Sequence, residues 1–590
     1  MECVNIKIDG KDFSVPENYT VLDAARENGI HIPTLCYLKD SNEIGACRFC
    51  LVEVVGTRSL QASCVYPVSE GLEVYTSTPV VLKARKDVLE LILSNHDARC
   101  YICKRNGNCE LRQLAEELNV SSLPYEGENI QYKIDDLSPA IVRDNNKCIV
   151  CRRCVSACQM QGISVIQAKG RGFATSIGSI YDKSLADVAC INCGQCIEAC
   201  PTGALYEKDH TARVWKAIND PDRYVVFQTA PAVRAALGEE FGLPIGTAVT
   251  GKMVAAIRRL GADKVFDTDT GADFTIMEEG YELLDRLNNG GTLPMITSCS
   301  PGWVKYCEQY YPEFIPNLSS CKSPHMMLGA ITKTYYAEKV GIDPQKIYNV
   351  SVMPCIAKKY EIDRPEMEAD GLRDVDAVLT TRELARMIKE KQINFVDLPE
   401  EGFDAPYGEA TGAGVIFGAS GGVMEAALRT VGSVLKGENL SDIEFTAVRG
   451  QGRKEFKVKL PKVTLKGVVV SGTAAAKEVL EDIKAGRCDY QFIEVMGCPG
   501  GCVVGGGQPI VSAKVRAVTD VFGLRAAALY DEDKISSLRM SHDNPFVKTV
   551  YREFLEKPNS EKAHHLFHTS YQAKEKMVGD LLGRPTFGPR

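Results

Sequence analysis

The first 80 residues alternate apolar and polar positions in short runs, which predicts a small mixed β domain. The runs VNIKI (4–8) and DFSV (12–15) have the two-residue period of strands, and Asp9-Gly10 between them predicts a tight hairpin turn. The stretch VLDAARENG (21–29) has helical spacing, and a cysteine-rich loop follows it. We therefore predict one domain over residues 1–80.

Helical periodicity replaces this alternation in the next segment. The stretches 81–96 and 109–120 place apolar residues three and four positions apart around a second set of cysteines. Two internally similar cysteine runs follow, near residues 148 and 190. These changes of pattern predict domains at 81–126 and 127–209.

The rest of the chain has an α/β pattern. Strand-like runs such as KVFDTD, LPMITS, YNVSVMP and QFIEVMG are combined with helical stretches such as GKMVAAIRRLGA. We predict a large domain at 210–574, and a tail at 575–590 that has too little pattern to assign. Because single cores rarely exceed about 250 to 300 residues, the predicted fold is a multidomain α+β and α/β protein.

Composition excludes some classes of protein. Of 590 residues, 45% are apolar and 25% charged, as in ordinary globular proteins. A net charge of -8 without a basic run argues against nucleic-acid binding. No apolar run reaches the roughly 18 residues of a membrane span, and the start reads as a hairpin instead of a secretion signal. We expect a cytoplasmic protein without a membrane or nucleic-acid partner.

Cysteine usage changes the picture most. The chain has 23 cysteines, and fifteen of them lie between Cys36 and Cys200, many with C-x2-C spacing. A chain with a full-sized core needs no disulfide staples, whereas this spacing lets several thiolates converge on one metal centre. We therefore expect reduced thiols and iron–sulfur clusters.

The first cysteine set has the spacing C-x10-C-x2-C-x13-C and consists of Cys36, Cys47, Cys50 and Cys64. Four thiolates suit a 2Fe–2S cluster, and the set resembles that of plant-type ferredoxin domains. A zinc site or free buried thiols are the alternatives.

The second set has the pattern H-x3-C-x2-C-x5-C and consists of His96, Cys100, Cys103 and Cys109. Three cysteines leave one ligand of a 4Fe–4S cluster missing, and His96 is the nearest candidate. The pattern resembles that of His-ligated clusters in hydrogenases and respiratory dehydrogenases. Zinc is the alternative.

Two runs of C-x2-C-x2-C-x3-C follow. In bacterial two-cluster ferredoxins the fourth cysteine of each run serves the other cluster. One 4Fe–4S cluster is therefore expected on Cys148, Cys151, Cys154 and Cys200, and a second on Cys158, Cys190, Cys193 and Cys196. A zinc domain is the alternative. Clusters in sequence order suggest an electron wire, which fits a respiratory-complex subunit equally well up to residue 209.

Three further motifs lie far apart in the large domain: TSCSPGW (297–303), MPCIAKK (353–359) and EVMGCPGGCVVGGGQP (494–509). The glycines of the third allow the backbone to approach a bulky inorganic centre. The three motifs resemble the signatures of the FeFe hydrogenases, and the resemblance extends over residues 1–574.

The resemblance implies an H-cluster, in which a 4Fe–4S cube is joined to a two-iron unit bearing carbon monoxide, cyanide and azadithiolate. It places Cys355, Cys498 and Cys502 on the cube, with Cys502 as the bridge. It also implies that the two-iron unit lies against Pro231, Met353, Lys358, Phe417 and Met496, and that Lys358 donates a hydrogen bond to a cyanide.

Glu279, Glu282 and Arg286 occupy one face of a predicted helix, at i, i+3 and i+7. Such a pattern alone is most often a solvated, salt-bridged face. The resemblance instead implies that these residues, with Ser319 and Cys299, form a path that carries protons to the metal centre.

The most serious departure from the family pattern lies at one residue, and milder ones lie at His325, Ile356 and Val504. Ser300 stands where the family motif TSCCP has the fourth cysteine of the cube, and a hydroxyl is a harder and less acidic donor than a thiol. Three outcomes are open: Ser300 ligates as an alkoxide, Cys299 ligates while Ser300 relays protons, or the cube is labile. The second is slightly favoured, because a relay tolerates a hydroxyl better than a cube tolerates the loss of a thiolate.

The sequence predicts a hydrogenase that exchanges electrons with ferredoxin or flavodoxin, depends on H-cluster maturation proteins and works as a monomer. A hydrogen sensor or low-activity relative is one rival, and a non-catalytic electron-transfer or cluster-assembly protein is another. No G-x-G-x-x-G follows a strand, so NAD(P) would require a partner chain.

Overall fold

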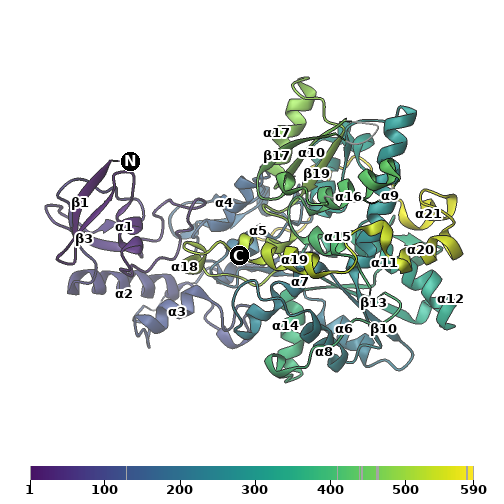
Figure 1. Ribbon diagram of the computed structural model, residues 1–590. Helices are drawn as coiled ribbons and strands as arrows, with labels where there is room; N and C mark the ends of the chain where they lie inside the picture. Colours follow the sequence, from purple (N-terminus) through teal and green to yellow (C-terminus); the bar gives the residue numbers. More distant parts are fainter. Residues whose placement is uncertain are drawn as a thin grey trace.

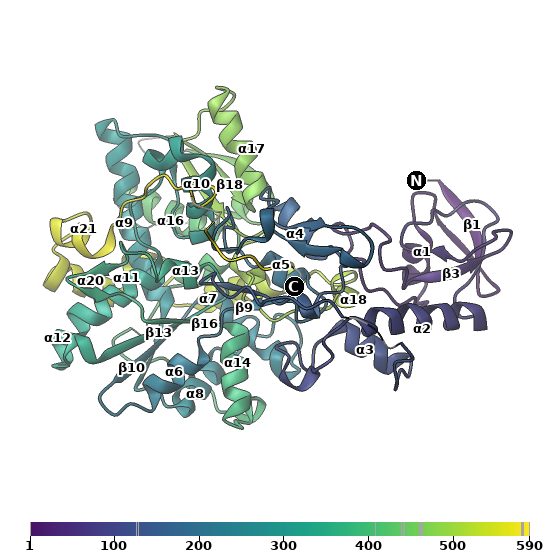
Figure 2. The same cartoon turned by 180° about the vertical axis from the view of Figure 1, so that it is seen from behind.

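Figure 1 shows the computed structural model of the chain, which describes residues 2–125, 127, 129–407, 409–437, 439, 443–459, 464–579 and 583–588. A small N-terminal body lies at one end of an elongated molecule, and a much larger body fills the other. Figure 2, the view from behind, shows the same division, with short helices and loops between the two bodies.

The small body is a five-stranded sheet with the order β2-β1-β5-β3-β4. Its first two strands form the predicted hairpin, and both turn residues, Asp9 and Gly10, have the positive φ that a type I′ turn requires. Helix α1 (Val21–Glu27) begins at a capping box between Thr20 and Asp23. The strands are β1 (Cys3–Ile8), β2 (Lys11–Pro16), β3 (Leu51–Val54), β4 (Gln61–Ala62) and β5 (Glu73–Tyr75).

Two helices lead from this sheet to a module built around the paired cysteine runs. They are α2 (Pro79–Ser94) and α3 (Glu110–Glu117), which match the predicted helices. In the module, helices α4 and α5 pack together, and strand β6 pairs with β9. Its elements are β6 (Ile141–Arg143), α4 (Arg153–Met160), β7 (Gln167–Lys169), β8 (Ser176–Gly178), α5 (Gln195–Ala199) and β9 (Leu205–Glu207).

The large body contains two four-stranded sheets. The first has the order β11-β10-β13-β16 and is parallel throughout; the second has the order β12-β19-β18-β17, with only β17 antiparallel. The strands are β10 (Tyr224–Thr229), β11 (Lys264–Asp267), β12 (Met295–Ile296), β13 (Ile347–Met353), β16 (Ala377–Thr380), β17 (Arg453–Lys459), β18 (Thr464–Ser471) and β19 (Phe492–Met496).

The three motifs of the large body start where parallel strands end. Cys299 follows β12, Cys355 follows β13 and Cys498 follows β19. In open α/β sheets the carboxyl ends of the strands form the usual ligand crevice. The topology therefore brings three motifs that are distant in sequence to one place.

Helices surround the two sheets. Helix α9 (Thr268–Asn289) contacts α11 (Pro324–Ile331) and α16 (Gly422–Lys436). The other helices are α6 (Thr211–Ile218), α7 (Pro231–Arg234), α8 (Thr250–Leu260), α10 (Pro301–Tyr310), α12 (Ala337–Val340), α13 (Lys358–Glu361), α14 (Thr381–Glu390), α15 (Gly412–Val415), α17 (Thr473–Lys484), α18 (Ala513–Arg516), α19 (Val521–Ile535), α20 (Pro545–Val550) and α21 (Glu561–Phe567). The short strands β14 (Glu368–Ala369) and β15 (Leu372–Arg373) form a separate hairpin.

Two buried arginines join the bodies. Arg153 forms a bidentate pair with Glu110, at 3.0 and 2.9 Å, and donates to the backbone carbonyl of Cys36. Arg382 binds Glu198 at 2.8 Å and Glu207 at 2.9 Å, so it ties the two-cluster module to the large body. Bidentate and multiply hydrogen-bonded arginines fix geometry better than single contacts.

The tail has no helix or strand in its described part, residues 575–579 and 583–588. It runs back along the two-cluster module, where Met577 bridges to Val188 and the amide of Phe587 donates to the carbonyl of Asp182.

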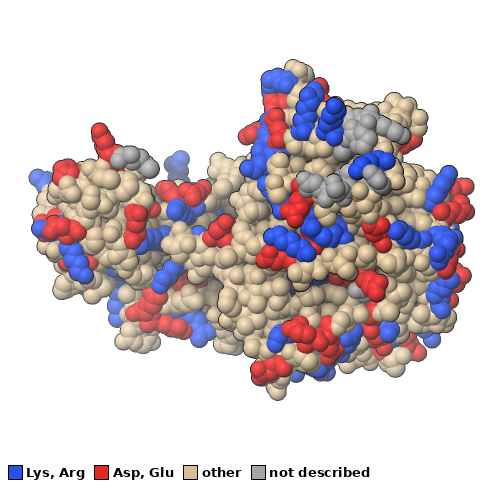
Figure 3. Space-filling view, in the orientation of Figure 1, with Lys and Arg blue, Asp and Glu red and all other residues tan. Residues whose placement is uncertain are grey.

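No helix in the described part of the chain is long and apolar enough to cross a membrane. On the face shown in Figure 3, basic and acidic side chains are interspersed over both bodies. The predicted multidomain α+β and α/β fold is confirmed. The domain boundaries stay predictions, and the one at residue 126 lies outside the described residues.

Candidate metal centres and proton route

The first four predicted ligands converge in the small body. The Sγ atoms of Cys50 and Cys64 are 3.3 Å apart, and the amides of Cys36 and Cys47 each donate to the other's sulfur at 3.4 Å. Gly45 has a φ of 59°, which favours glycine there. None of the 23 cysteines forms a disulfide. The arrangement fits a 2Fe–2S cluster, which needs four converging thiolates.

His96 is poised as a ligand. Its Nδ1 atom is buried and has no hydrogen-bond partner among the described residues. Burial and the nearby charge of Lys147 lower the pKa of His96 to about 4, so the imidazole is neutral. A buried neutral imidazole with a free nitrogen is what metal ligation requires. The three cysteines of this set lie close by in sequence, on a short turn and at the start of α3.

The structure places cysteines of the two runs beside each other. One cavity is lined by the four thiols of the first expected cluster: Cys148, Cys151, Cys154 and Cys200. In the second set, burial raises the pKa of the Cys196 thiol, and the neighbouring thiols of Cys190 and Cys158 raise it further. This arrangement therefore brings the two sets of predicted ligands into two groups.

The second group touches the third motif of the large body. The thiol of Cys498 lies 3.9 Å from the carbonyl oxygen of Cys193. A Cβ atom on Gly194 would lie 2.5 Å from a methyl of Ile356 and 3.1 Å from the Cα of Gly506. Because only bare backbone fits there, the two-cluster module and the third motif are in direct contact.

A cavity lies among the three motifs of the large body. The residues that line it include these, which the sequence analysis assigned to the centre: Pro231, Cys299, Ser300, Met353, Cys355, Lys358, Phe417, Met496 and Cys502. The thiols of Cys355 and Cys502 both raise the pKa of Cys498, so the three expected cube ligands are neighbours. Apolar walls beside three neighbouring thiols fit an H-cluster, whose cube is held by thiolates.

The charge of Lys358 is held in a small network. Its Nζ atom donates to the carboxylate of Glu361 at 2.8 Å and to the carbonyl oxygen of Cys299 at 3.1 Å. The Nε2 atom of His325 donates to the same carboxylate, 2.6 Å away. Although burial opposes it, these neighbours lower the pKa of Glu361 to about 2. Neither Glu361 nor its link to Lys358 was predicted; the i, i+3 spacing on α13 was the only sequence signal.

Cys299 and Ser300 face different neighbours. Burial, followed by the charge of Glu279, raises the pKa of the Cys299 thiol, and Lys358 opposes this shift. The hydroxyl oxygen of Ser300 instead accepts a hydrogen bond from the amide of Gly497, at 3.1 Å. Gly497 directly precedes Cys498. Cys299 is therefore on the side of the acidic residues, and Ser300 is beside an expected cube ligand.

The predicted proton-path residues lie on α9 and the segment facing it. Glu282 pairs with Arg286 at 2.6 Å and accepts from the hydroxyl of Ser319 at 2.8 Å. Glu279 is 1% exposed, and neither of its carboxylate oxygens has a hydrogen-bond partner among the described residues. Burial, then the charge of Glu282, raises the pKa of Glu279 to about 8. The hydrogen-bonded run thus ends at Ser319, with the buried Glu279 and the half-buried Cys299 beyond it.

The fold and these sites define an iron–sulfur oxidoreductase with a buried, thiol-lined catalytic centre. Comparison with known families agrees. The match to "Iron only hydrogenase large subunit, C-terminal domain" covers residues 223–506, and the match to "Iron hydrogenase small subunit" covers 519–574. Three iron–sulfur matches precede them: a 2Fe-2S cluster binding domain at 2–79, the NADH-ubiquinone oxidoreductase-G iron-sulfur binding region at 85–123 and a 4Fe-4S dicluster domain at 147–208.

Similar proteins cover nearly the whole chain. The "NADP-reducing hydrogenase subunit HndD" of Solidesulfovibrio fructosivorans is 48% identical over 98% of this chain and 100% of its own length. "Iron hydrogenase 1" of Clostridium pasteurianum is 42% identical over 96% of this chain and 99% of its own length. A solved variant of apo FeFe hydrogenase HydA1 from Chlamydomonas reinhardtii is 41% identical, covers 62% of this chain and 100% of its own, and has a TM-score of 0.56.

The chain belongs to the FeFe, or iron-only, hydrogenase family. It is a hydrogenase with accessory iron–sulfur domains, and the predictions of family and of hydrogenase activity are confirmed.

Proposed function

We propose that this hydrogenase interconverts protons and dihydrogen at an H-cluster held by Cys355, Cys498 and Cys502, and that it exchanges electrons with ferredoxin or flavodoxin. One observation supports the electron route above all: the thiol of Cys498 lies 3.9 Å from the carbonyl of Cys193, a proposed ligand of the last accessory cluster. The accessory route comprises one 2Fe–2S and three 4Fe–4S clusters on the four predicted ligand sets.

When bound, the two-iron unit supplies the redox chemistry at iron. The chain's own residues orient it, exclude water and move protons. Met353, Phe417 and Met496 give the cavity apolar walls, and the ammonium of Lys358, fixed by Glu361, is a donor directed at the cavity. Fixed donors in a site without water stabilise charge at little reorganisation cost.

The proton route runs from Arg286 through Glu282 and Ser319 to Glu279 and Cys299. Its outer half is hydrogen-bonded, and Glu279 at its inner half holds a proton near neutral pH because burial raises its pKa to about 8. General acids work best when their pKa lies near the working pH. Cys299 is the last carrier, since its thiol lies close enough to Glu279 and Lys358 for both charges to shift its pKa.

We assign Ser300 to the cube side of the centre. Its hydrogen bond from Gly497 fixes it next to Cys498, and the neighbours of Cys299 are those of a proton relay. The fourth position of the cube is then met by an oxygen donor or left weakly held. This assignment leaves Cys299 free to carry protons. It differs from the alternative that ligand chemistry alone slightly favours, in which Cys299 binds the cube and Ser300 relays protons.

A second electron partner has one observation in its favour. The relative that is 48% identical over nearly the full length is named an NADP-reducing hydrogenase subunit. We therefore keep as the second candidate a complex in which a partner chain binds the nicotinamide. The use of cysteines as cluster ligands instead of disulfides supports a reducing, cytoplasmic location. Maturation proteins would supply the two-iron unit, and a monomer would suffice for activity with a dye.

Anaerobic infrared spectroscopy of protein matured with the two-iron cofactor tests the centre. Carbonyl and cyanide bands, with hydrogen evolution from a reduced dye, are expected. Absence of these bands while the accessory clusters are present would remove the proposed active site. Assays with reduced ferredoxin or NADPH as the sole donor then separate the two partners: evolution with ferredoxin alone supports the first, and evolution that needs NADPH and a partner chain supports the second.

A further inference from the structure

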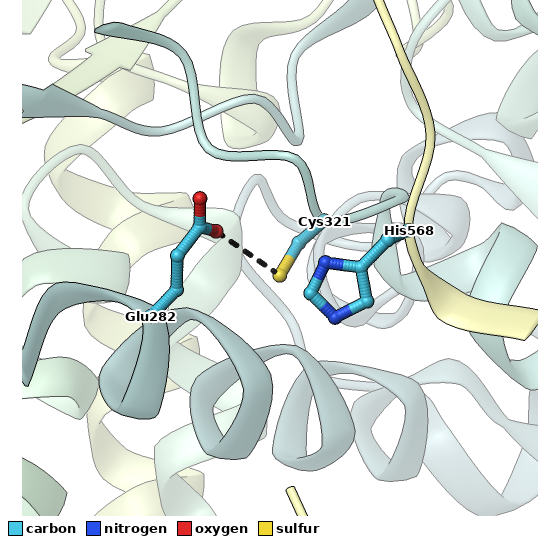
Figure 4. Close-up of side chains that lie close together, drawn as sticks. All are labelled: Glu282, Cys321 and His568. Atoms are coloured by element: carbon cyan, nitrogen blue, oxygen red, sulfur yellow. Dashed lines mark hydrogen bonds between the residues drawn. The ribbon is translucent and has the colours of Figure 1, made fainter. Parts of the chain in front are cut away.

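A mixed set of ligand-type side chains lies at the outer part of the proton route and takes no part in any predicted cluster. Among the described residues, Glu282, Cys321 and His568 bring a carboxylate oxygen, a thiol and an imidazole nitrogen within 4.8 Å of one another. Figure 4 shows the thiol between the carboxylate and the imidazole ring. Cys321 is fully buried, and Glu282 and His568 are partly buried.

The backbone fixes two of these side chains opposite each other. Cys321 and His568 form an isolated antiparallel bridge. It is flanked by two backbone hydrogen bonds of 2.7 Å, from Lys322 to Phe567 and from Thr569 to Ser320. Paired residues of this kind have their side chains on the same face and close together. The thiol and the imidazole are therefore held in place by main chain rather than by their own contacts.

The imidazole is oriented as in a metal site. One ring nitrogen of His568, Nε2, lies 3.1 Å from the carboxylate of Glu278, and the hydroxyl of Tyr551 donates to that same carboxylate. Histidines that bind metals commonly donate their other ring N–H to a carboxylate, which sets the tautomer. Nδ1 is then left as the ligand atom, and its contact, the hydroxyl of Ser320 at 2.8 Å, can rotate away.

The surroundings favour a cation. Three carboxylates lie near the Cys321 thiol: burial raises the pKa of this thiol, and the charges of Glu282, Glu279 and Glu278 raise it further. Arg286 is the one described cation hydrogen-bonded to any of the three. His564 is exposed and packs against His568, with ring centroids 3.9 Å apart.

We propose that Glu282, Cys321 and His568 bind one Zn²⁺ ion and that its binding closes the proton route. A thiolate, an imidazole and a carboxylate are the ligands zinc prefers, and water completes a tetrahedral site. The thiol proton passes to the buffer when the thiolate binds zinc. The Oε2 atom of Glu282 that accepts from Ser319 is also the atom nearest the thiol, so zinc competes with the relay for it. This second half of the proposal rests on the proton route proposed above.

The test uses anaerobic holoenzyme, stripped of loose metal by a chelator and then dialysed against Zn²⁺. Bound zinc is counted for the wild type, Cys321→Ala, His568→Gln and Cys488→Ala. Cys488, a partly exposed thiol outside the site, is the control for adventitious binding. We expect one zinc more in the wild type and Cys488→Ala than in the other two. X-ray absorption at the zinc edge should show one sulfur at about 2.3 Å and nitrogen or oxygen at about 2.0 Å.

Hydrogen evolution from a reduced dye is then measured against zinc concentration. Zinc should inhibit the wild type reversibly, and Cys321→Ala should need at least about tenfold more zinc. Equal zinc content in the wild type and both site variants, each with unchanged iron content, overturns the site. Zinc that binds there without inhibition overturns its control of the proton route and speaks against Glu282 as a carrier. Absence of zinc binding together with normal evolution overturns the inference and leaves the proposed function standing.

Discussion

The hydroxyl of Ser300 accepts a hydrogen bond from the amide of Gly497, 3.1 Å away, and is thereby fixed beside Cys498. A thiolate has this position in the family motif. Where an oxygen donor replaces it, an iron–sulfur cube loses a ligand of matched softness.

Ser300→Cys is therefore expected to raise the occupancy of the cube. The measurement is iron per chain after identical reconstitution, with electron paramagnetic resonance of the reduced cube before the two-iron unit is added. Ser300→Ala, which has no donor at all, is the matched control and should lie at or below the wild type. Unchanged iron content and activity in Ser300→Cys would count against a defective fourth ligand.

Glu279→Gln should slow hydrogen evolution by about 10²- to 10⁴-fold, the usual contribution of a positioned proton carrier. The amide keeps the shape of the side chain but cannot carry a proton. Infrared bands of the two-iron unit should be unchanged, which separates lost proton transfer from lost cofactor. Glu390→Gln, on the exposed surface, is the control. Near-normal turnover with Gln at position 279 would exclude this carboxyl from the route.

The pH dependence of evolution should report the same carboxyl. Because burial raises the pKa of Glu279 to about 8, it is protonated and able to donate at neutral pH and loses its proton above about pH 8. Evolution by the wild type should fall as the pH rises through this range. The residual activity of Glu279→Gln should lack that step. A profile of the same shape in both proteins would assign the step to another group.

His96→Ala should remove one 4Fe–4S cluster. The buried Nδ1 atom has no partner among the described residues, so the substitution takes away a ligand and leaves the fold's hydrogen bonds intact. The expected loss is about four irons per chain, with slower electron transfer from ferredoxin. His31→Ala, at a half-exposed histidine, should keep full iron content. Retention of all iron in His96→Ala would favour a different fourth ligand.

Arg382→Met should loosen the joint between the two-cluster module and the large body. It leaves Glu198 and Glu207 buried without this partner, which typically costs about 3 to 5 kcal/mol. Denaturant unfolding should show the loss, and electron transfer through the accessory clusters should slow. Arg386→Met is the control, because that partly exposed side chain pairs only with Glu207. Equal effects of the two substitutions would argue against a special role for Arg382.

Local spacing was enough to propose the accessory ligand sets, which stay predictions. The expected crossing of Cys200 to the first run follows from the two-cluster ferredoxin pattern, in which the fourth cysteine of each run serves the other cluster. The predicted hairpin at Asp9-Gly10 and the helices α2 and α3 followed from periodicity for the same reason: each depends on neighbours in sequence.

The remaining features depend on pairs far apart in the chain. Cys321 matches no local motif, and only the pairing of its segment with residues 567–569 brings His568 to it. The neighbours that distinguish Cys299 from Ser300 come from α9 and from the loop after β19, which no local pattern relates. Chemistry alone could therefore not decide between the two residues.

The backbone contact between Gly194 and Gly506 sets the electron-transfer distance between the proposed last accessory cluster and the proposed catalytic centre. A Cβ atom at either position would collide with the opposite backbone, within 3.1 Å at Gly194 and 2.8 Å at Gly506. Main chain, not side-chain packing, therefore fixes the spacing between the two proposed centres. A side chain at either glycine would push the two backbones apart and slow electron transfer between these centres.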